Sequence, residues 1–213
     1  MTLLKIKKEI SQLANPRQAK ILSRFFKTGP GEYGEGDIFL GIKVPVQRTV
    51  VKKFRELPLK DTVALLRSRI HEHRLIALLI LVDQYKKSEP LIQKKIYEVY
   101  LKNTDKINNW DLVDLTAPNI VGAYLIDKSR QPLYHLARSK SLWERRIAIL
   151  ATLAFIRHYD FKDALALAKI LLHDSHDLIH KAVGWMLREL GKRNHAVEEK
   201  FLLQVVGLKE FYV

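Results

Sequence analysis

The sequence of 213 residues contains no cysteine. This absence excludes disulfide bonds, thiolate nucleophiles and cysteine-based zinc sites, and it favours a reducing compartment, so we expect a cytoplasmic protein. Long hydrophobic runs are also missing, since no apolar stretch approaches the roughly 20 residues that a membrane-spanning helix needs. At the N-terminus, residues 1–8 interleave lysines with aliphatic side chains, which predicts an amphipathic helix and not a signal peptide.

Negative charge is scarce relative to positive charge. The chain has 23 Asp and Glu residues against 37 Lys and Arg residues, for a net charge of +14. Such an excess on a folded chain indicates a polyanionic partner, either nucleic acid or an anionic membrane surface, and a basic surface without a partner is the alternative. Apolar residues make up 47% of the chain, which is enough to build a core. We expect residues 1–213 to form a single α-helical repeat domain.

Patterns of alternating polarity that indicate β-strands are absent, and nearly every segment repeats its apolar residues with the 3.6-residue period of a helix. The main interruption is segment 28–37, whose four glycines predict a loop. Asp61 is a candidate N-cap, because an apolar helical pattern follows it. Helices are predicted over residues 3–13, 17–27, 46–56, 61–69, 72–85, 90–101, 110–117, 120–126, 132–139, 143–157, 163–172, 177–191 and 196–206.

An internal repeat underlies several of these helices. The similar segments 72–79 and 143–150 place Ala77 and Ala148 71 positions apart, which is about twice a period of 35 or 36. One such period before Ala148 lies Val113, and one period after it lies Gly184. Helices that recur in one register predict hairpins stacked as HEAT-like repeats. The expected fold is therefore an all-α helical-repeat solenoid, an α–α superhelix with a concave basic face.

The repeat register also groups residues that are far apart in the chain. Asp114, Ile149 and Trp185 occupy equivalent positions in three successive repeats. Trp110 lies one helical turn before Asp114, so both side chains leave the same face of their helix. Arg146 lies three residues before Ile149. We therefore expect these side chains to project from one stripe of the concave face, where an aromatic plane beside a carboxylate suits a flat cationic ligand within a polyanion.

Four motifs in this order and spacing are fairly specific for a known family. They are Phe39-Leu40-Gly41-Ile42-Lys43-Val44-Pro45 with Arg48, Asn109-Trp110-Asp111-Leu112-Val113-Asp114, Glu144-Arg145-Arg146-Ile147-Ala148-Ile149-Leu150, and Lys181-Ala182-Val183-Gly184-Trp185-Met186-Leu187-Arg188-Glu189. With these motifs, the chain resembles, over about residues 25–193, the AlkD-type alkylpurine DNA glycosylases, all-helical HEAT-like repeat enzymes that remove N3- and N7-alkylated purines from duplex DNA.

The resemblance implies roles for individual residues. Asp114 is the expected catalytic carboxylate, and Trp110 and Trp185 are expected to flank the lesion nucleotide. The expected DNA-binding residues, all basic, are Arg146, Arg145, Lys43, Arg48, Lys181 and Arg188. The lesion base already carries positive charge and leaves readily, so a carboxylate that stabilises the developing sugar cation suffices, without metal or cofactor. We expect a monomer that acts on double-stranded DNA and yields an abasic product without strand cleavage.

Each of these residues also has a simpler interpretation. Tryptophans on helices are commonly packing residues, the interpretation we adopt for Trp143, and a helical Asp commonly pairs with a neighbouring lysine. Arg146 is alternatively a partner of a neighbouring helix, and a further alternative is that Arg145 is the residue that faces DNA. The backbone amides of segment 39–42, together with Lys43 and Arg48, are candidates to hold a phosphate or to anchor a helix start.

Other motifs and rival functions complete the set of hypotheses. His173, His176 and His180 are spaced like metal ligands, but Asp174-Ser175 predicts a hairpin turn that places His173 on a different helix, so we expect no metal site. His71-Glu72-His73 lacks the spacing of a zinc-protease helix.

The alternative to a glycosylase is a non-catalytic HEAT-repeat protein that recognises bent or branched DNA, and a protein-binding scaffold ranks below both. The chain ends at Phe211-Tyr212-Val213, where many members of the family continue, so the resemblance does not extend to a C-terminal clasp on DNA.

Overall fold

The structure is a computed structural model that describes residues 1–206; the terminal residues Phe211–Val213 noted above lie outside this part. Throughout the described residues the secondary structure is helical, apart from one isolated parallel bridge between Ile38 and Ile70, so the all-α prediction is confirmed. The chain divides into two compact units, Met1–Thr116 and Ala117–Val213. None of the described helices is both long enough and apolar enough to cross a bilayer.

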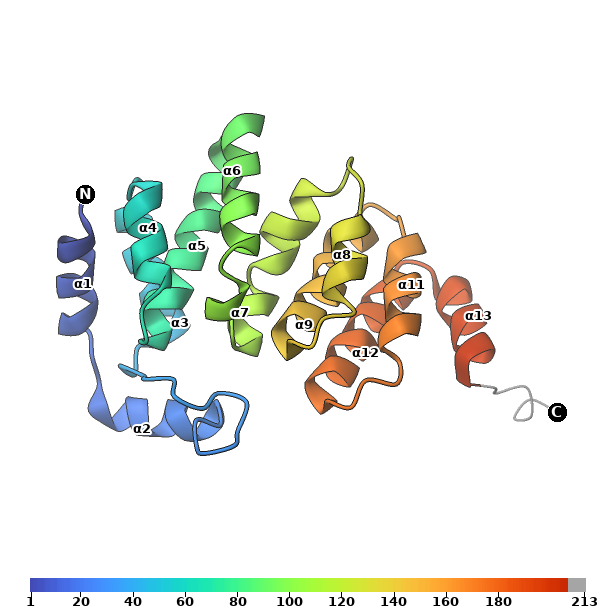
Figure 1. Ribbon diagram of the computed structural model, residues 1–213, viewed down its shortest axis with the longest axis horizontal. Helices are drawn as coiled ribbons and strands as arrows, with labels where there is room; N and C mark the ends of the chain where they lie inside the picture. The colour runs from blue at the N-terminus through green and yellow to red at the C-terminus, as the bar shows by residue number, and fades with distance from the viewer. Residues whose placement is uncertain (207–213) are drawn as a thin grey trace. The chain divides into compact units, whose positions relative to one another are not determined.

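The first unit contains seven α-helices and one 3-10 helix among its described residues (Figure 1). These elements are α1 (Leu3–Gln12), α2 (Pro16–Phe25), α3 (Val44–Phe54), α4 (Leu59–Leu66), α5 (His71–Lys87), α6 (Pro90–Leu101), η1 (Thr104–Lys106) and α7 (Trp110–Asp114). The second unit has the π-helix η2 (Pro118–Gly122), α8 (Gln131–Leu136), α9 (Leu142–Ala151), α10 (Leu153–Arg157), α11 (Lys162–Leu171), α12 (Asp177–Gly191) and α13 (His195–Val206).

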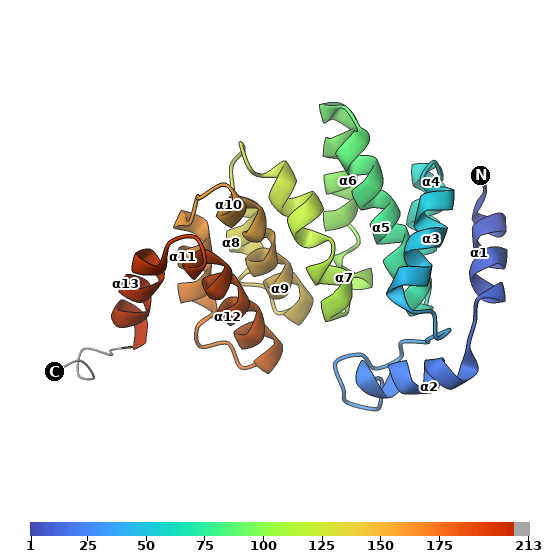
Figure 2. The ribbon, with the colours of Figure 1, turned by 180° about the vertical axis from the view of Figure 1, so that it is seen from behind.

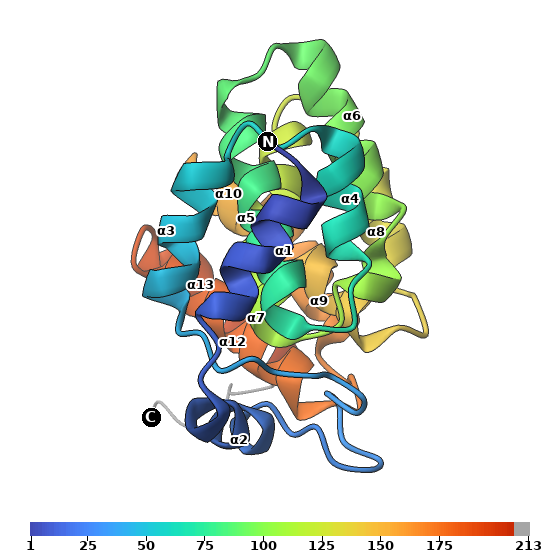
Figure 3. The ribbon, with the colours of Figure 1, turned by 90° about the vertical axis from the view of Figure 1, so that its left-hand side faces the viewer.

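Helix α5 is the core of the first unit. Every residue from His71 to Val82 is buried, because α5 packs against α3, α4, α6 and α7 on different sides. Figure 3 shows α1 between α3 and α4, against which it packs. Helix α2 has no buried residue and runs crosswise to α1, α3 and α5, beyond their ends (Figures 1 and 2). The unit is therefore a packed helical layer with one peripheral helix.

Helices α9 and α12 form the core of the second unit. Helix α9 packs against η2, α8, α11 and α12, and α12 also packs against α11 and α13 (Figure 2). Trp143, at the start of α9, is only 9% exposed, which confirms its interpretation as a packing residue. The predicted helix over 143–157 is broken at Thr152. The hydroxyl of this fully buried residue donates to the carbonyl oxygen of Ile149 at 2.6 Å, a local bond that competes with a continuous helix.

Two further expectations about local structure are corrected. Asp61 is not an N-cap, because α4 begins at Leu59 after Pro58; its carboxylate accepts a hydrogen bond from the backbone of Leu3 at 3.2 Å and so joins α1 to α4. The predicted helix over 110–117 ends at Asp114, and a π-helix begins at Pro118. Pro118 lacks the backbone N–H that would donate an α-helical hydrogen bond to residue 114, so the α-helical ladder does not continue through it, although the preceding Ala117 keeps helical dihedral angles (φ −57°, ψ −45°).

The repeat register is only partly realised. Ala77, Val113 and Ala148 are fully buried, as equivalent positions require, whereas Gly184 is exposed. The register therefore slips on α12, where the buried small side chains are those of Ala182 and Val183. Ile149 is fully buried as well, so the expectation that it projects from a surface stripe is wrong. Ile149 lies on α9, which packs against five other helical elements, so the core and not the repeat determines the burial of this apolar side chain.

Candidate functional site

Helix α7 carries the central pair of the predicted site. The side chain of Asn109 caps its N-terminus by accepting from the backbone of Trp110 at 2.8 Å. The next three residues, 111–113, are buried, whereas Trp110 and Asp114 are each half-buried. These two residues are four apart and therefore lie on the same side of the helix. They are the two residues of α7 whose side chains reach solvent.

The indole of Trp110 is the end of a stack of rings. It stacks on Phe26 with ring centroids 5.1 Å apart and planes at 20°. Phe26 stacks on Phe39 at 5.1 Å, and Phe39 stacks on the imidazole of His71 at 4.4 Å. Phe25 meets the edge of Trp110 at 5.8 Å and is itself 61% exposed. Trp110 is thus supported on one side and adjoins an exposed aromatic residue, Phe25, that the sequence did not single out.

Asp114 lies close to a buried hydroxyl pair. The phenol of Tyr100, which is fully buried, shares a hydrogen bond of 3.0 Å with the hydroxyl of Thr116. Burial raises the pKa of Tyr100 far above its usual range, and the negative charge of Asp114 adds to that effect. The carboxylate of Asp114 is therefore near enough to influence the interior of the first unit while remaining half-buried.

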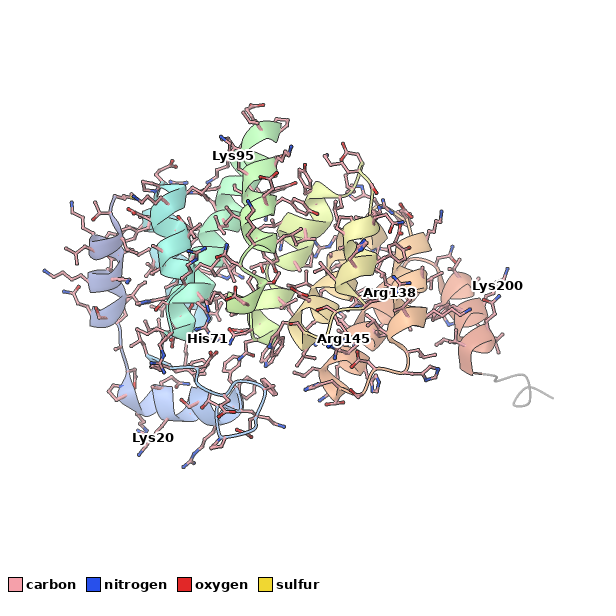
Figure 4. The ribbon with its side chains drawn as sticks, in the orientation of Figure 1. Lys20, His71, Lys95, Arg138, Arg145 and Lys200 are labelled. Atoms are coloured by element: carbon pink, nitrogen blue, oxygen red, sulfur yellow. The ribbon has the colours of Figure 1, made fainter. Side chains whose placement is uncertain are left out.

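A buried network of charged groups contacts α7 through its buried residue Asp111. Nε2 of His71 donates to Oδ2 of Asp111 at 2.9 Å, and Nδ1 donates to Oδ2 of Asp37 at 3.0 Å. The guanidinium of Arg74 donates to the same oxygen of Asp37 at 2.6 Å, and the amide of Asn108 donates to its other oxygen at 3.3 Å. In Figure 4, His71 lies at the end of α5 nearest α2. The network joins α5, the glycine-rich loop and α7.

The charges of this network shift the pKa values of its members. Burial disfavours the charged form of His71, but Asp111 and Asp37 outweigh that effect and raise its pKa to about 9. Burial also disfavours the charged form of Asp37, which by itself raises its pKa. The hydrogen bond from His71 and the nearby charge of Arg74 outweigh this effect, so the pKa of Asp37 is lowered overall. The imidazole of His71 is therefore protonated at neutral pH.

Three of the four backbone amides of segment 39–42 are engaged within the protein, which corrects the expectation that they hold a phosphate. Those of Leu40, Gly41 and Ile42 donate to the carboxylate of Glu72 at 2.8–3.2 Å. Glu72 is fully buried, so the anion that satisfies these amides belongs to the protein itself. Gly41 has a φ of +85°, and a β-carbon there would overlap the backbone of Asn15. The segment joins the starts of α2 and α5, and the carbonyl oxygen of Ile42 accepts from the side chain of Gln47 at 2.7 Å, which ties it to the start of α3, the helix that the structural alternative named.

The expected DNA-binding residues of the second unit differ in how far they are already engaged. Arg146 is 5% exposed and donates to the carbonyl oxygen of Leu178 in α12, which matches the alternative that it binds a neighbouring helix. Arg145 donates to the carboxylate of Asp174 at 2.6 and 3.2 Å and to two backbone oxygens (Figure 4). Four of the five N–H groups of Arg145 are therefore in use.

Helix α12 places the remaining residues of that unit. Trp185 is half-buried and follows the exposed Gly184, which has open space in front of it. Lys181 is exposed and pairs with the exposed carboxylate of Asp177 at 2.6 Å, a contact that contributes little to stability. Arg188 is exposed in the last turn of the helix. These three side chains are accessible to a ligand.

Exposed basic side chains occur on several helices of the first unit, including α2 and α3. Lys43 and Arg48, the predicted residues, are exposed at the start of α3. Helix α2 adds Arg17, Lys20 and Arg24, at a spacing of three and four residues that places them on one face. We call these three residues the α2 stripe. The helix contains no acidic residue, so the stripe is a surface of one sign, and its periodicity was visible in the sequence.

The histidines of the second unit do not form a metal site. His173 follows the end of α11, whereas the side chain of His176 caps α12 by accepting from the backbone of Leu178 at 3.1 Å. The predicted hairpin turn between them is confirmed. Within residues 1–206, no group of three or more His, Asp or Glu side chains is arranged to hold a metal ion.

Comparisons with known proteins agree with the helical architecture. The sequence profile of a family described as DNA alkylation repair enzyme matches residues 6–209. The solved structure of a predicted DNA alkylation repair enzyme from Enterococcus faecalis is similar, with a TM-score of 0.69 and 18% sequence identity over 91% of this chain and 90% of that chain. At this identity the similarity shows the fold alone, a helical-repeat fold. The search of curated proteins found no match.

Proposed function

The chain belongs to the DNA alkylation repair enzyme family, and from this premise we propose that it is a DNA glycosylase. Family membership supports a role in DNA repair. The proposed reaction is hydrolysis of the N-glycosidic bond of N3- or N7-alkylated purines in duplex DNA. The product would be a free base and an abasic site, without cleavage of the strand. We propose that the protein acts as a monomer on DNA in the cytoplasm.

The reaction needs stabilisation of charge more than activation of a leaving group. An N3- or N7-alkylated purine is already cationic, so its departure as a neutral base requires little acid catalysis. Positive charge develops on the deoxyribose as the bond breaks, and a fixed carboxylate stabilises it electrostatically or positions the attacking water. We assign this role to Asp114. No metal or cofactor is required for either step.

The observation that carries the proposal is that α7 buries some of its side chains and exposes others on one side. Its middle residues 111–113 are buried, and Trp110 and Asp114 are the residues that reach solvent on one side. Trp110 is backed by Phe26 and edged by the exposed Phe25. An indole face beside a carboxylate suits a cationic base or a developing sugar cation, with a cation–π contribution of about 0.5–2 kcal/mol. Partial exposure of both side chains supports a role in binding a ligand.

Residues outside α7 also have proposed roles. We propose that Trp185, half-buried on α12, also contacts the lesion nucleotide, and that the exposed Lys43, Arg48, Lys181 and Arg188 bind the DNA backbone. Arg146 and Arg145 are engaged with α12 and with Asp174, so any role for them in binding DNA depends on exchanging these bonds. The net charge of +14 supports a polyanionic partner.

The direct test is product analysis with a defined lesion. A duplex oligonucleotide with one N7-methylguanine is incubated with the protein, the released base is identified by mass spectrometry, and strands are examined with and without alkaline treatment. We expect free N7-methylguanine, and strand scission at the lesion only after alkali; a duplex with unmodified guanine is the control. Scission without alkali contradicts the absence of lyase activity. Tight binding to branched DNA with no base release would instead identify a non-catalytic DNA-binding protein.

A further inference from the structure

The imidazole of His71 lies between two carboxylates in the interior of the first unit. Its two nitrogens are 2.9 Å from Asp111 and 3.0 Å from Asp37, and its side chain is 2% exposed. Ionised carboxylate oxygens only accept hydrogen bonds, so both imidazole nitrogens must donate. A neutral imidazole has a single N–H and would leave one nitrogen lone pair facing a carboxylate. The geometry therefore requires the imidazolium form.

The charges that face His71 balance only in this form. Asp37 approaches from the glycine-rich loop, Arg74 from α5 and Asp111 from α7, and the two rings packed on the imidazole, Phe39 and Phe26, are uncharged. Arg74 is 3% exposed and also contacts Asp37. Two cations thus face two carboxylates. Loss of the imidazolium proton leaves one carboxylate without a counter-charge in a buried site, which is costly.

Helix α7 depends on contacts of this kind because it is only five residues long. Asp111 joins it to α5 through His71. The preceding residue, Trp110, joins it to the same imidazole by a second route, through the stacked rings of Phe26 and Phe39. Helix α7 is thus connected to His71 in two ways, by the hydrogen bond of Asp111 and by the ring stack that begins at Trp110. Both connections together determine the orientation of α7.

We propose that His71 is a positioning residue, which by bridging Asp37 and Asp111 fixes α7 and with it Trp110 and Asp114 in the geometry required for base excision. It acts through Asp111 and the aromatic stack and not by contact with the substrate. This inference rests on the proposed function, because it assigns His71 to the same site.

The proposal predicts an alkaline limit to catalysis. As pH rises through about 9, the pKa of His71, the bridge loses its proton and α7 is released from α5. A displacement of about 1 Å at a reacting group can reduce a rate on the order of 100-fold. We therefore expect the excision rate at saturating DNA to fall 10- to 100-fold above this pH. The half-saturating DNA concentration should change little, because the backbone-binding lysines and arginines keep their charge there.

The experiment compares single-turnover excision of N7-methylguanine from pH 6 to pH 10 in the wild type, Asp111→Asn and His71→Gln, each checked for folding by circular dichroism. The amide of Asp111→Asn still accepts from Nε2 but carries no charge, so the pKa of His71 falls and the loss of activity moves towards neutral pH. His71→Gln should excise the base slowly at every pH, and its rate should show no further fall at alkaline pH. Asp105→Asn, which removes an exposed carboxylate of the nearby η1, should keep the wild-type profile.

A second measurement needs the wild type alone and covers the case in which the variants do not fold. The imidazole signals of His71 and the indole N–H signal of Trp110 are followed by NMR as pH rises. Both signals should shift with the same midpoint pH, and this pH should coincide with the pH at which the excision rate falls. An unchanged profile in folded Asp111→Asn, or a Trp110 signal that ignores the titration of His71, overturns the proposal. Joint titration of both residues without excision at any pH would contradict the proposed function but preserve the coupling of His71 to α7.

Discussion

At the scale of single residues, α7 separates the side chains that hold the helix in place from those that face solvent. Asp111 is turned inward to the imidazole of His71, whereas Trp110 and Asp114 remain half-buried. The aromatic residue Trp110 serves both purposes, because one face packs on Phe26 while the side chain keeps access to solvent. The simple choice between a packing tryptophan and a binding tryptophan therefore does not apply to it.

Replacement of the two half-buried tryptophans tests their role at the lesion. Trp110→Leu and Trp185→Leu keep apolar bulk but remove the indole face. A lost cation–π contact of about 0.5–2 kcal/mol predicts a rate reduction of about 2- to 30-fold for each variant in single-turnover excision. Tyr159→Asn is the matched control, since Tyr159 is a 69% exposed aromatic residue with a φ of +60°, a conformation that Asn tolerates. Equal rates in all three variants would remove the tryptophans from the site.

A pair of glycines tests the close approach of segment 39–42 to α2. Gly31 and Gly41 both have positive φ, but only Gly41 would meet neighbouring backbone if it carried a β-carbon. Gly31→Ala should lower the free energy of unfolding by about 1 kcal/mol, from backbone strain alone. Gly41→Ala should lower it by at least about 3 kcal/mol, because the backbone of Asn15 must also move. Urea denaturation measures both values, and equal losses would contradict the close approach.

At the scale of elements, α2 and α5 have opposite characters. Helix α5 is buried over residues 71–82, and its N-terminal side chains His71, Glu72 and Arg74 each bind an element distant in sequence. Helix α2 has no buried residue and carries the α2 stripe next to the exposed Phe25. A basic helix face next to Phe25, which contacts Trp110, supports the proposal that a DNA backbone binds along α2.

The α2 stripe is tested by a triple charge removal. Arg17→Gln, Lys20→Gln and Arg24→Gln together should weaken DNA binding and lower the slope of log affinity against log salt by up to about 2.7, at about 0.9 per phosphate contact. The matched control removes Lys86, Lys95 and Lys102 in the same way. These exposed residues belong to the same unit, and Figure 4 shows Lys95 at the opposite end of that unit from Lys20. Equal effects of the two triple variants would indicate general attraction without a preferred surface.

Elements also show how far the sequence can predict this structure. The 3.6-residue period found the helices, including the helix with Trp110 and Asp114, because periodicity reports which face of a segment is buried. It does not report the partner across the fold. Glu72 binds amides that precede it by some 30 residues, and His71 binds Asp111 40 residues later. The polar start of an otherwise apolar helix was the available signal that these side chains are buried together.

The same limit explains the failure of the repeat register. Spacing of 35 or 36 residues aligned Gly184 with Ala77 and Ala148, but packing on α12 is shifted by one or two residues to Ala182 and Val183. Loops of different length separate the helices, so a fixed period cannot hold along the chain. The register holds at the neighbouring Ala148, and Ile149 is buried because its helix is packed on several sides, whereas Trp110 and Asp114 rested on a spacing within one helix.

At the scale of the whole molecule, the chain divides into two units that each contain a packed core, with Trp110 and Asp114 in the first unit and Trp185 in the second. Two histidines whose pKa values are shifted strongly by burial and nearby charges, His71 and His73, both belong to the first unit. Burial and the nearby charges of Lys7 and Arg74 lower the pKa of His73 to about 4, opposite to the shift of His71. These two histidines give the fold an optimum of stability between them.

The pH dependence of stability follows from the opposite pKa shifts of His71 and His73. His71 has a raised pKa, so its contribution is complete below about 6.5, the value in the unfolded chain, and is lost as pH rises through about 9. His73 has a lowered pKa and binds a proton more readily when unfolded, so stability is lost as pH falls from about 6.5 through about 4. Urea denaturation should show the highest free energy of unfolding near pH 6.5. His73→Gln should flatten the acid side alone, and an unchanged acid side would contradict the assignment.

The role of Asp114 is tested most directly by measuring binding and excision with the same preparation of Asp114→Asn. The substitution keeps the size of the side chain and removes its charge. We predict that the variant binds a duplex with one N7-methylguanine within about 2-fold of the wild type, because uniform binding does not depend on this group. Its single-turnover excision should fall on the order of 100-fold or more, the loss expected when a preorganised charge is removed from the reacting centre. Excision at the wild-type rate would contradict the account.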